Sequence, residues 1–157
     1  MGDESAVFEF EKDFAQSLRC VPMSVRLKLD VCGIKLSLKQ WNRLDTADRQ
    51  QLLQQPCEGQ AERAAYRRSV IGMVEARTGE PPKDLPIESQ PEWQRPERVP
   101  EQLAAHLQAL QLPPLSTAAW AALGPVRRFT LLKLSRPDHS NDNFLPALRE
   151  FGLLGGG

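Results

Sequence analysis

The chain has 157 residues, a length typical of a single domain with a sizeable hydrophobic core. Twenty lysines and arginines balance twenty aspartates and glutamates, and neither half is strongly basic, which argues against a nucleic-acid-binding protein. No apolar run approaches the roughly 18 residues of a membrane span. The acidic start MGDESAVFEFEKDF lacks the apolar core of a signal peptide, so we expect a cytoplasmic protein.

The first predicted element is a helix over residues 7–18. Phe10, Phe14 and Leu18 recur there at the spacing of one helix face. The alternation in VFEFE, at the start of this segment, also fits a short extended stretch. Of the two interpretations, the helix is favoured because its apolar face continues beyond the alternating residues.

Three further helices should follow in the first half. Pro22 suits a helix start, and Gly33 suits a left-handed helix end. Ser37 and Gln40 have the spacing of a capping box, and Thr46 is the expected cap of the next helix. The core positions of these helices should be Val25, Leu29, Cys32, Leu38, Trp41, Leu44, Leu52 and Leu53.

The longest predicted helix covers residues 60–77, and a proline-rich connection follows it. The apolar stripe of the helix consists of Tyr66, Val70, Met73 and Val74. Residues 80–100 contain six prolines, so we expect an extended connection over 80–97. Ile87 and Trp93 are the apolar side chains in it that should contact the folded body.

Four helices are predicted in the second half. Pro100 and Pro125 suit helix starts, and Ser116 and Asn143 suit helix caps. Pro146 lies in the first turn of the last helix, where its missing N–H is tolerated. The expected core positions are Leu103, Leu107, Leu110, Trp120, Leu123, Phe129, Leu131, Leu132, Phe144, Leu148 and Phe151.

One phrase occurs in each half of the chain: LSLKQWNRL at 36–44 and LSTAAWAAL at 115–123. Over residues 36–53 and 115–132, seven of eighteen positions are identical without a gap. The identical pairs are Leu36/Leu115, Ser37/Ser116, Trp41/Trp120, Leu44/Leu123, Arg49/Arg128, Leu52/Leu131 and Leu53/Leu132. Duplication of a helical unit explains this better than convergence of two helix-turn-helix segments, which is the alternative.

The predicted fold is therefore an all-α, compact single domain over residues 1–157. It is built from two tandem copies of a short-helix unit, at 20–79 and 98–153, joined by the proline-rich connection 80–97. Trp41 and Trp120 lie on equivalent helices, and we expect both in the core rather than stacked on a ligand.

Catalytic motifs are absent from the sequence. It has no glycine-rich phosphate loop, no GxSxG and no cysteine–histidine pair at a useful spacing. His106 lies on an amphipathic helix, where a surface or boundary position is expected. We therefore expect neither an enzyme nor a bound cofactor, and no small-molecule substrate is evident.

The polar loop 136–143 invites a metal-binding interpretation. Asp138, Ser140 and Asp142 imitate the first calcium ligands of an EF-hand. Asn143 stands where the turn glycine belongs, and Arg149 stands where the bidentate glutamate belongs. Capping and turn formation at the start of the last helix is the favoured interpretation.

Three cysteines, an odd number, argue against a disulfide framework. Cys32 lies on an apolar helix face and is expected in the core. Cys20 and Cys57 each neighbour a proline at a helix boundary, where exposure is expected. A transient iron–sulfur or other metal site that uses Cys20 and Cys57 is kept as an alternative.

Two basic clusters complete the set of candidate sites. One holds Arg63, Arg67 and Arg68, and the other holds Arg127, Arg128, Lys133 and Arg136. Such clusters are usually solvated helix faces, and the alternative is contact with an acidic surface of a protein partner.

Long segments of the chain resemble the conserved nitrate reductase-associated protein family, which is found chiefly in cyanobacteria. They are FEFEKDFAQSLRCVPMSVRLKLDVCGIKLSLKQW (8–41), RTGEPPKDLP (77–86), PEW (91–93) and LLKLSRPDHSNDNFLPALREFGL (131–153). The resemblance implies a gene near those of assimilatory nitrate reductase and of the molybdenum cofactor. It implies an accessory factor for that molybdopterin and iron–sulfur enzyme, with no catalytic residues to carry over.

The resulting hypothesis is a non-catalytic accessory factor that binds assimilatory nitrate reductase and assists its maturation or activity. An adaptor or regulator of electron delivery to the reductase is a further alternative. The expected partner-binding residues are Arg19 and Cys20 in one turn, and Arg136, His139 and Asn143 in the polar loop.

Overall fold

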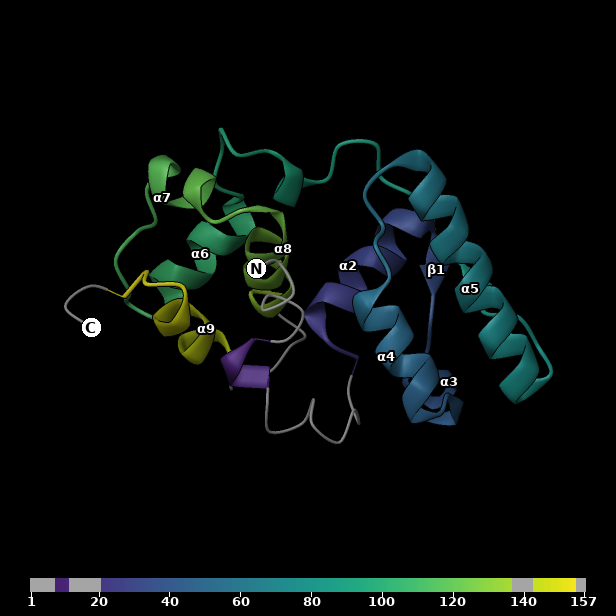
Figure 1. Cartoon of the computed structure of the whole chain (residues 1–157). Coiled ribbons are helices and arrows are strands. Elements are labelled where there is room, and N and C mark those ends of the chain that lie inside the picture. Colours follow the sequence, from purple (N-terminus) through teal and green to yellow (C-terminus); the bar gives the residue numbers. More distant parts are fainter. Residues whose placement is uncertain (1–7, 12–20, 137–142, 155–157) are drawn as a thin grey trace. The chain divides into compact units, whose positions relative to one another are not determined.

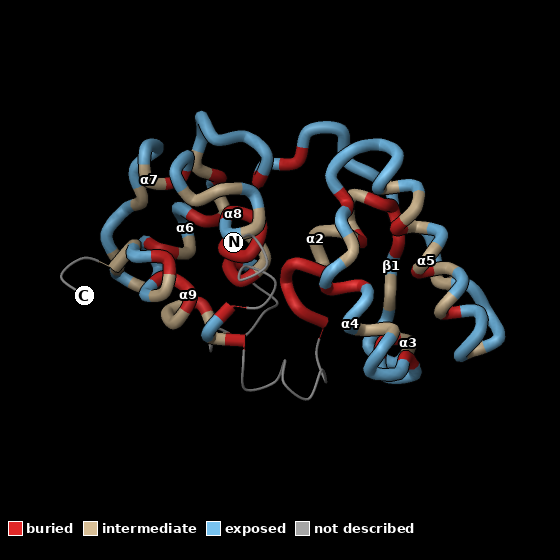
Figure 2. Tube along the Cα trace, in the orientation of Figure 1, coloured by how far each residue is buried: buried red, intermediate tan, exposed pale blue. Residues whose placement is uncertain are grey.

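The computed structural model describes residues 8–11, 21–136 and 143–154. Regular structure in these residues is mostly helical, which confirms the predicted all-α class (Figure 1). The chain divides into two compact units, residues 1–88 and residues 89–157. The boundary falls within the predicted connection 80–97, and each unit has its own buried residues (Figure 2).

The first unit is built around α5, which contacts the three helices before it. Its elements are the 3₁₀ helix η2 (Glu9–Glu11), α2 (Met23–Cys32), β1 (Ile34–Lys35), α3 (Leu38–Arg43), α4 (Thr46–Gln54), α5 (Gln60–Thr78) and β2 (Lys83–Asp84). Helices α2, α3 and α4 all pack on α5. Tyr66, Val70 and Val74 of α5 are fully buried, as predicted, whereas Met73 is only partly buried.

Two separate features require a glycine at position 33, where α2 ends. Its φ of 75° is left-handed, a conformation that residues with a Cβ rarely adopt. A Cβ there would also lie 3.0 Å from two carbons of Ile87 and 3.1 Å from the Leu85 carbonyl oxygen. Ile87 therefore contacts the first unit as predicted, although 60% of its surface remains exposed.

A two-stranded antiparallel pairing links β1 to β2, and the sequence did not predict it. Ile34 pairs with Asp84 and Lys35 pairs with Lys83. Strands of two residues are too short to show the alternation that identifies a strand in a sequence. The pairing places the beginning of the predicted connection in the first unit.

Of the predicted helix over 7–18, the structure describes only residues 8–11, and there it differs from the prediction. Residues 9–11 form a 3₁₀ helix, and residues 12–20 lie outside the described part of the chain. The buried Glu11 carboxylate accepts hydrogen bonds from the N–H of Phe8 at 3.1 Å and of Met23 at 2.8 Å. Met23 is the first residue of α2, and Pro22 before it has no capping side chain. Glu11 thus supplies the N-terminal cap of α2 from a distance in sequence.

The caps of α3 and α4 test the capping predictions directly. Ser37 and Gln40 form the predicted capping box of α3. The cap of α4 is Asp45, not Thr46, because the Asp45 carboxylate accepts the N–H of Asp48 at 2.8 Å. Leu38 was also predicted in the core, but it begins α3 and is 52% exposed.

The second unit is built around α8. Its elements are the 3₁₀ helix η3 (Glu92–Gln94), α6 (Glu101–Ala109), α7 (Thr117–Ala122), α8 (Pro125–Leu134) and α9 (Phe144–Glu150). Helix α8 contacts α6, α9 and η3. Its core consists of Trp93, Leu103, Leu107, Trp120, Phe129, Leu131, Leu134, Phe144, Ala147, Leu148 and Phe151. Leu110, Leu123 and Leu132, which were predicted in this core, are only half-buried.

Trp93 confirms its predicted contact with the folded body. It is buried, and its ring meets the ring of Phe129 edge-on at 5.7 Å between centroids. Pro125 stands at the first position of α8, and Ser116 caps α7, as predicted. Asn143 precedes α9 at the cap position, but its side chain makes no capping hydrogen bond.

The two copies of the repeated phrase have the same local structure. The hydroxyls of Ser37 and Ser116 each accept a backbone N–H three residues later, at 3.1 Å in both copies. The side chains of Trp41 and Trp120 are both fully buried. This confirms that the phrase is structural in both units, while the common origin of the two copies stays a prediction.

The equivalent arginines also make equivalent contacts. Arg49 donates to the carbonyl oxygens of Trp41 and Asn42, at 3.2 and 3.1 Å. Arg128 donates to those of Trp120 and Ala121, at 3.5 and 3.0 Å. Each guanidinium also lies above the indole of its own copy, at 5.7 and 6.0 Å from the ring centroid. In each unit, the arginine satisfies carbonyls at the end of the short helix that carries the tryptophan.

Candidate functional site

The predicted partner-binding residues are only partly covered by the structure. Arg19, Cys20 and His139 lie outside the described residues. Arg136 is exposed just after the end of α8, and its backbone N–H donates to Lys133 at 3.3 Å. Asn143 is half-buried just before α9. These two residues therefore flank the polar segment 137–142, next to the facing ends in sequence of α8 and α9, two helices that contact each other.

The first basic cluster is not simply a solvated helix face. Arg67 donates to the carbonyl oxygens of Cys32 and Gly33, at 2.9 and 3.1 Å, and pairs with Asp84 at 2.6 Å. It thereby satisfies the C-terminal carbonyls of α2 and fixes β2 beside them. The Nε atom of Arg63 is buried and has no hydrogen-bond partner among the described residues. Only Arg68 of this cluster is exposed.

The second basic cluster is divided between surface and interior. Arg128 is buried, and besides the α7 carbonyls its Nε donates to Trp93 at 2.7 Å. Burial lowers the pKa of the Arg128 guanidinium from its very high ordinary value. Arg127 and Lys133 lie over the rings of Phe151 and Phe129, at 5.0 and 5.3 Å. Successive positions on a helix face different directions, so this run of cations does not form one patch.

A cysteine pair that the sequence did not predict lies in the core of the first unit. The Sγ atoms of Cys32 and Cys57 are 3.3 Å apart, and both residues are free and buried. Cys57 was expected to be exposed because it follows Pro56 in a loop, and that prediction is wrong: only 7% of Cys57 is exposed. The loop between α4 and α5 turns inward at this residue, where its thiol packs among apolar side chains.

The two thiols differ in their electrostatic surroundings. The hydrogen bond with Cys57 lowers the pKa of Cys32, burial opposes this, and the charges of Arg63 and Arg67 reinforce it. The same hydrogen bond raises the pKa of Cys57, and burial raises it further. Cys32 is therefore the member of the pair that ionises first.

Lys28 is a half-buried cation beside this pair. Its ammonium donates to the carbonyl oxygens of Leu52, Leu53 and Gln55, at 3.3, 2.9 and 2.8 Å. These carbonyls end α4, so Lys28 supplies the C-terminal cap of that helix. Burial lowers the pKa of Lys28. A lysine that caps from another helix leaves no local signal in the sequence.

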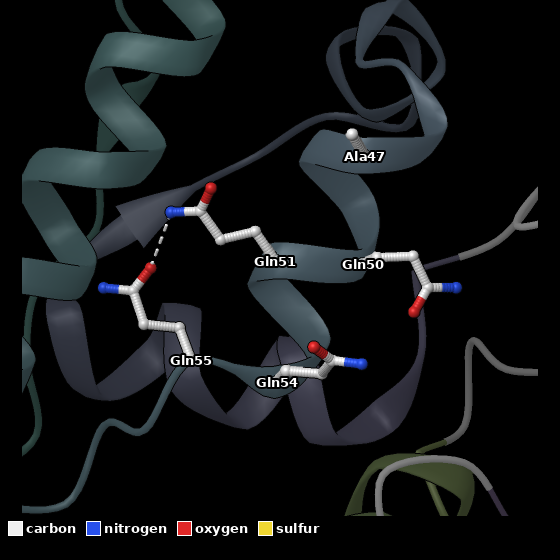
Figure 3. Close-up of a pocket in the computed structure, with 5 residues that line it drawn as sticks. All are labelled: Ala47, Gln50, Gln51, Gln54 and Gln55. Carbon is white, nitrogen blue, oxygen red and sulfur yellow. Dashed lines mark hydrogen bonds between the residues drawn. The ribbon is translucent and has the colours of Figure 1, made fainter.

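A shallow, open surface hollow lies over α4. It is lined by Ala47, Gln50, Gln51, Gln54 and Gln55 (Figure 3). The Gln51 side-chain amide donates to the Gln55 side-chain oxygen at 3.1 Å. Neutral amides can hydrogen-bond to many partners and carry no charge that selects one. The hollow alone therefore identifies no ligand.

His106 occupies the boundary position that the sequence predicted. It is half-buried on α6, and its ring meets that of Phe144 edge-on at 4.5 Å between centroids. Over residues 8–11, 21–136 and 143–154, no three histidine, cysteine, aspartate or glutamate side chains come close enough to hold a metal ion. His139 and Cys20 lie outside these residues.

Comparison with known proteins places the chain in a family. The family model described as conserved nitrate reductase-associated protein matches residues 7–151. The chain belongs to this family. Searches of curated proteins and of solved structures found no match. The family match covers both units and includes Arg19, Cys20, Arg136, His139 and Asn143.

The structure gives positions to the segments that resembled the nitrate reductase-associated family. Helix α2 and the strand after it lie within 8–41, and the last part of α8 and all of α9 lie within 131–153. In the part of this family member that the structure describes, no helix is long and apolar enough to cross a membrane.

The one tyrosine of this family member offers a test of its buried core. The Tyr66 hydroxyl donates to the Leu52 carbonyl oxygen at 2.8 Å, and burial raises the pKa of the phenol. Above pH ~10, the ordinary tyrosine pKa, the unfolded chain loses this proton and the folded chain keeps it. Stability should therefore fall as the pH rises through that value.

The measurement is an alkaline titration of phenolate absorption, followed beside circular dichroism. Phenolate should appear only as helical signal is lost. The urea-unfolded chain serves as control and should titrate at pH ~10. Ordinary titration of the phenol with full helical signal would contradict the burial of Tyr66.

Proposed function

We propose that this chain is a non-catalytic accessory protein that binds nitrate reductase and assists its maturation or its activity. The observation that carries the proposal is the family match over residues 7–151, whose description associates the family with nitrate reductase. A cytoplasmic location and a role in nitrate assimilation are parts of the same proposal.

The contact surface is proposed at the polar loop of the second unit. Arg49, Arg67 and Arg128 donate to backbone carbonyls within their own units, so they serve the fold. Arg136 is exposed after α8, next to the segment PDHSND. A guanidinium recognises carboxylates through a planar pair of N–H groups, so an acidic patch on the reductase is the complementary surface. Loops held on packed helices are common sites of such recognition.

A gene deletion tests the function itself. Nitrate reductase would be purified from cells with and without this protein, and its molybdenum, its iron and its specific activity measured. A deficit of either metal supports maturation, and the metal that is missing identifies the step. Full metal content with low activity supports the alternative role in regulation or electron delivery. Unchanged metal content and unchanged specific activity would overturn both the maturation role and the regulatory role.

A residue substitution tests the proposed surface. Arg136→Ala combined with His139→Ala should reduce activation of the reductase about tenfold, the loss expected when a central interface contact is removed. Arg98→Ala is the matched control, since Arg98 is an exposed arginine of the same unit. Circular dichroism and a thermal melt check that both variants fold. Equal activation by the wild type and the double variant would exclude this surface.

The metal-donor alternative depends on Cys20 and Cys57. Cys57 is buried against Cys32, so a shared metal would require the loop between α4 and α5 to open. Iron analysis of the chain purified without oxygen tests it. Stoichiometric iron that is lost in Cys57→Ser would support a donor role.

A further inference from the structure

Two thiols in contact inside the first unit have no part in the proposed binding surface. Only 3.3 Å separates the Sγ atoms of Cys32 and Cys57. We propose that Cys32 and Cys57 are a peroxide-reactive dithiol, which converts to a reversible disulfide within the first unit. This proposal does not depend on the association with nitrate reductase.

The positions of the two residues allow the bond to form. A disulfide has about 2.05 Å between its sulfurs, so these sulfurs must approach by roughly 1.3 Å. Cys32 is the last residue of α2, and Cys57 lies in the link between α4 and α5. Neither residue is inside a helix on both sides, so small adjustments at one helix end and one loop suffice. The disulfide would join α2 to the start of α5, with 24 residues, 33–56, between the cysteines.

The surroundings of the two sulfurs assign the two roles, although the charge of Arg63 lowers both thiol pKa values and that of Lys28 lowers the pKa of Cys57. The Cys32 thiol donates to the Arg63 carbonyl oxygen at 3.4 Å, and the charges of Arg63 and Arg67 favour its thiolate form. The Nε–H of Arg63 is buried without a hydrogen-bond partner among the described residues. Either sulfur can be the donor of the hydrogen bond between them, and the raised pKa of Cys57 makes it the thiol that keeps its proton. Cys32 is thus the nucleophile and Cys57 the resolving thiol.

Burial selects the class of oxidant. Cys32 is 4% exposed and Cys57 is 7% exposed. A bulky disulfide cannot align with a sulfur that is covered to this extent, because exchange requires an in-line approach. Hydrogen peroxide is close to water in size and needs to reach only one sulfur.

The reaction balances with peroxide as the only oxidant. The Cys32 thiolate attacks one peroxide oxygen, the O–O bond breaks, and the hydroxide that leaves takes up a proton to become water. Cys32 is then a sulfenic acid. The Cys57 sulfur attacks the Cys32 sulfur, the S–O bond breaks, and the second hydroxide leaves as water with the Cys57 proton. Two thiols are oxidised by two electrons in total, and one peroxide is reduced to two waters.

The experiment treats the reduced full-length chain with hydrogen peroxide. After quenching and alkylation under denaturing conditions, peptide mass spectrometry should find the peptides of Cys32 and Cys57 joined. Dithiothreitol should restore both thiols. A Cys20→Ser background removes the third thiol and excludes its participation. In this background the native Cys32 should react at least ~10-fold faster than in the urea-unfolded chain, since only the folded protein holds the cations beside it.

Two variants test the assigned roles. In Cys57→Ser, Cys32 should stop at sulfenic acid, which a cyclic 1,3-diketone traps when it is added together with urea to expose the buried sulfur. Arg63→Gln should slow the reaction of Cys32 several-fold, whereas Arg68→Gln, an exposed arginine on the same helix, should not. If Cys57→Ser does not fold, the measurements on the wild type and on Arg63→Gln still test whether the disulfide forms and whether Cys32 is the reactive thiol. Oxidation of Cys32 without a link to Cys57, or no rate advantage over the unfolded chain, would overturn the proposal.

Discussion

Replacement of Arg128 by methionine should destabilise the second unit by about 3–5 kcal/mol, the loss expected when a buried charged partner is removed. Arg128 is 7% exposed and donates to the carbonyl oxygens of Trp93 and Ala121, at 2.7 and 3.0 Å. Methionine fills similar space but has no donor, so the Trp93 carbonyl remains buried without this partner and the partly buried Ala121 carbonyl also loses its donor. The guanidinium contact with Trp120 is lost as well.

The repeated phrase of the sequence supplies the control for this prediction. Arg49 is the equivalent residue of the first unit, and it makes the same two kinds of contact. It is only half-buried, so water can replace its hydrogen bonds, and Arg49→Met should cost about 1 kcal/mol. Urea unfolding, with hydrogen exchange resolved by peptide, measures both losses. Equal losses of unfolding free energy in Arg128→Met and Arg49→Met would contradict the expectation that the buried arginine contributes more to stability than the half-buried one.

Several helix ends and one helix face show what the local sequence can predict. Ser37, Ser116, Gly33 and Pro125 act within a few residues of themselves, so their capping roles were predicted correctly. The long stripe of α5 covers several helical turns and was also predicted correctly at Tyr66, Val70 and Val74, while Met73 is only partly buried. These features depend on the spacing of residues along one element, which the sequence contains directly.

Contacts between distant residues could not be predicted in the same way. Glu11 caps α2, Lys28 caps α4, and Cys57 meets Cys32, each across a gap in sequence. In isolation, Glu11 and Lys28 are ordinary charged residues, and charged residues are usually exposed. Their burial follows from the packing of the helices, because unsatisfied helix ends in the core require donors and acceptors.

The candidate partner site was predicted from sequence polarity alone. The structure places Arg136 and Asn143 on either side of 137–142, while Arg19, Cys20 and His139 lie outside the described residues. Recognition of a partner depends on complementary shape and charge on two surfaces, and one sequence contains only one of them. Substitution of Arg136 and His139 therefore carries more information about this site than any further pattern in the chain.

The repeated tryptophan gives the second large effect: Trp41→Ala should destabilise the first unit by about 3–5 kcal/mol, the usual cost of deleting a buried tryptophan. The side chain of Trp41 is fully buried, and it packs within the same core as Leu44, Leu52 and Tyr66. Alanine leaves a cavity that the surrounding helices fill only in part. The loss would be measured by urea unfolding of the full chain, with circular dichroism as the signal.

Leu38 provides the matched control, since it lies on the same short helix and is 52% exposed. Leu38→Ala should change the free energy of unfolding by no more than about 0.5 kcal/mol, the range usual for surface substitutions. The comparison separates burial from helix position, because both substitutions introduce alanine into α3. It also tests the sequence prediction that placed Leu38 on the buried face. A loss of about 2 kcal/mol or more in Leu38→Ala, the usual range for a buried leucine, would restore that prediction and contradict the exposure of Leu38 in this structure.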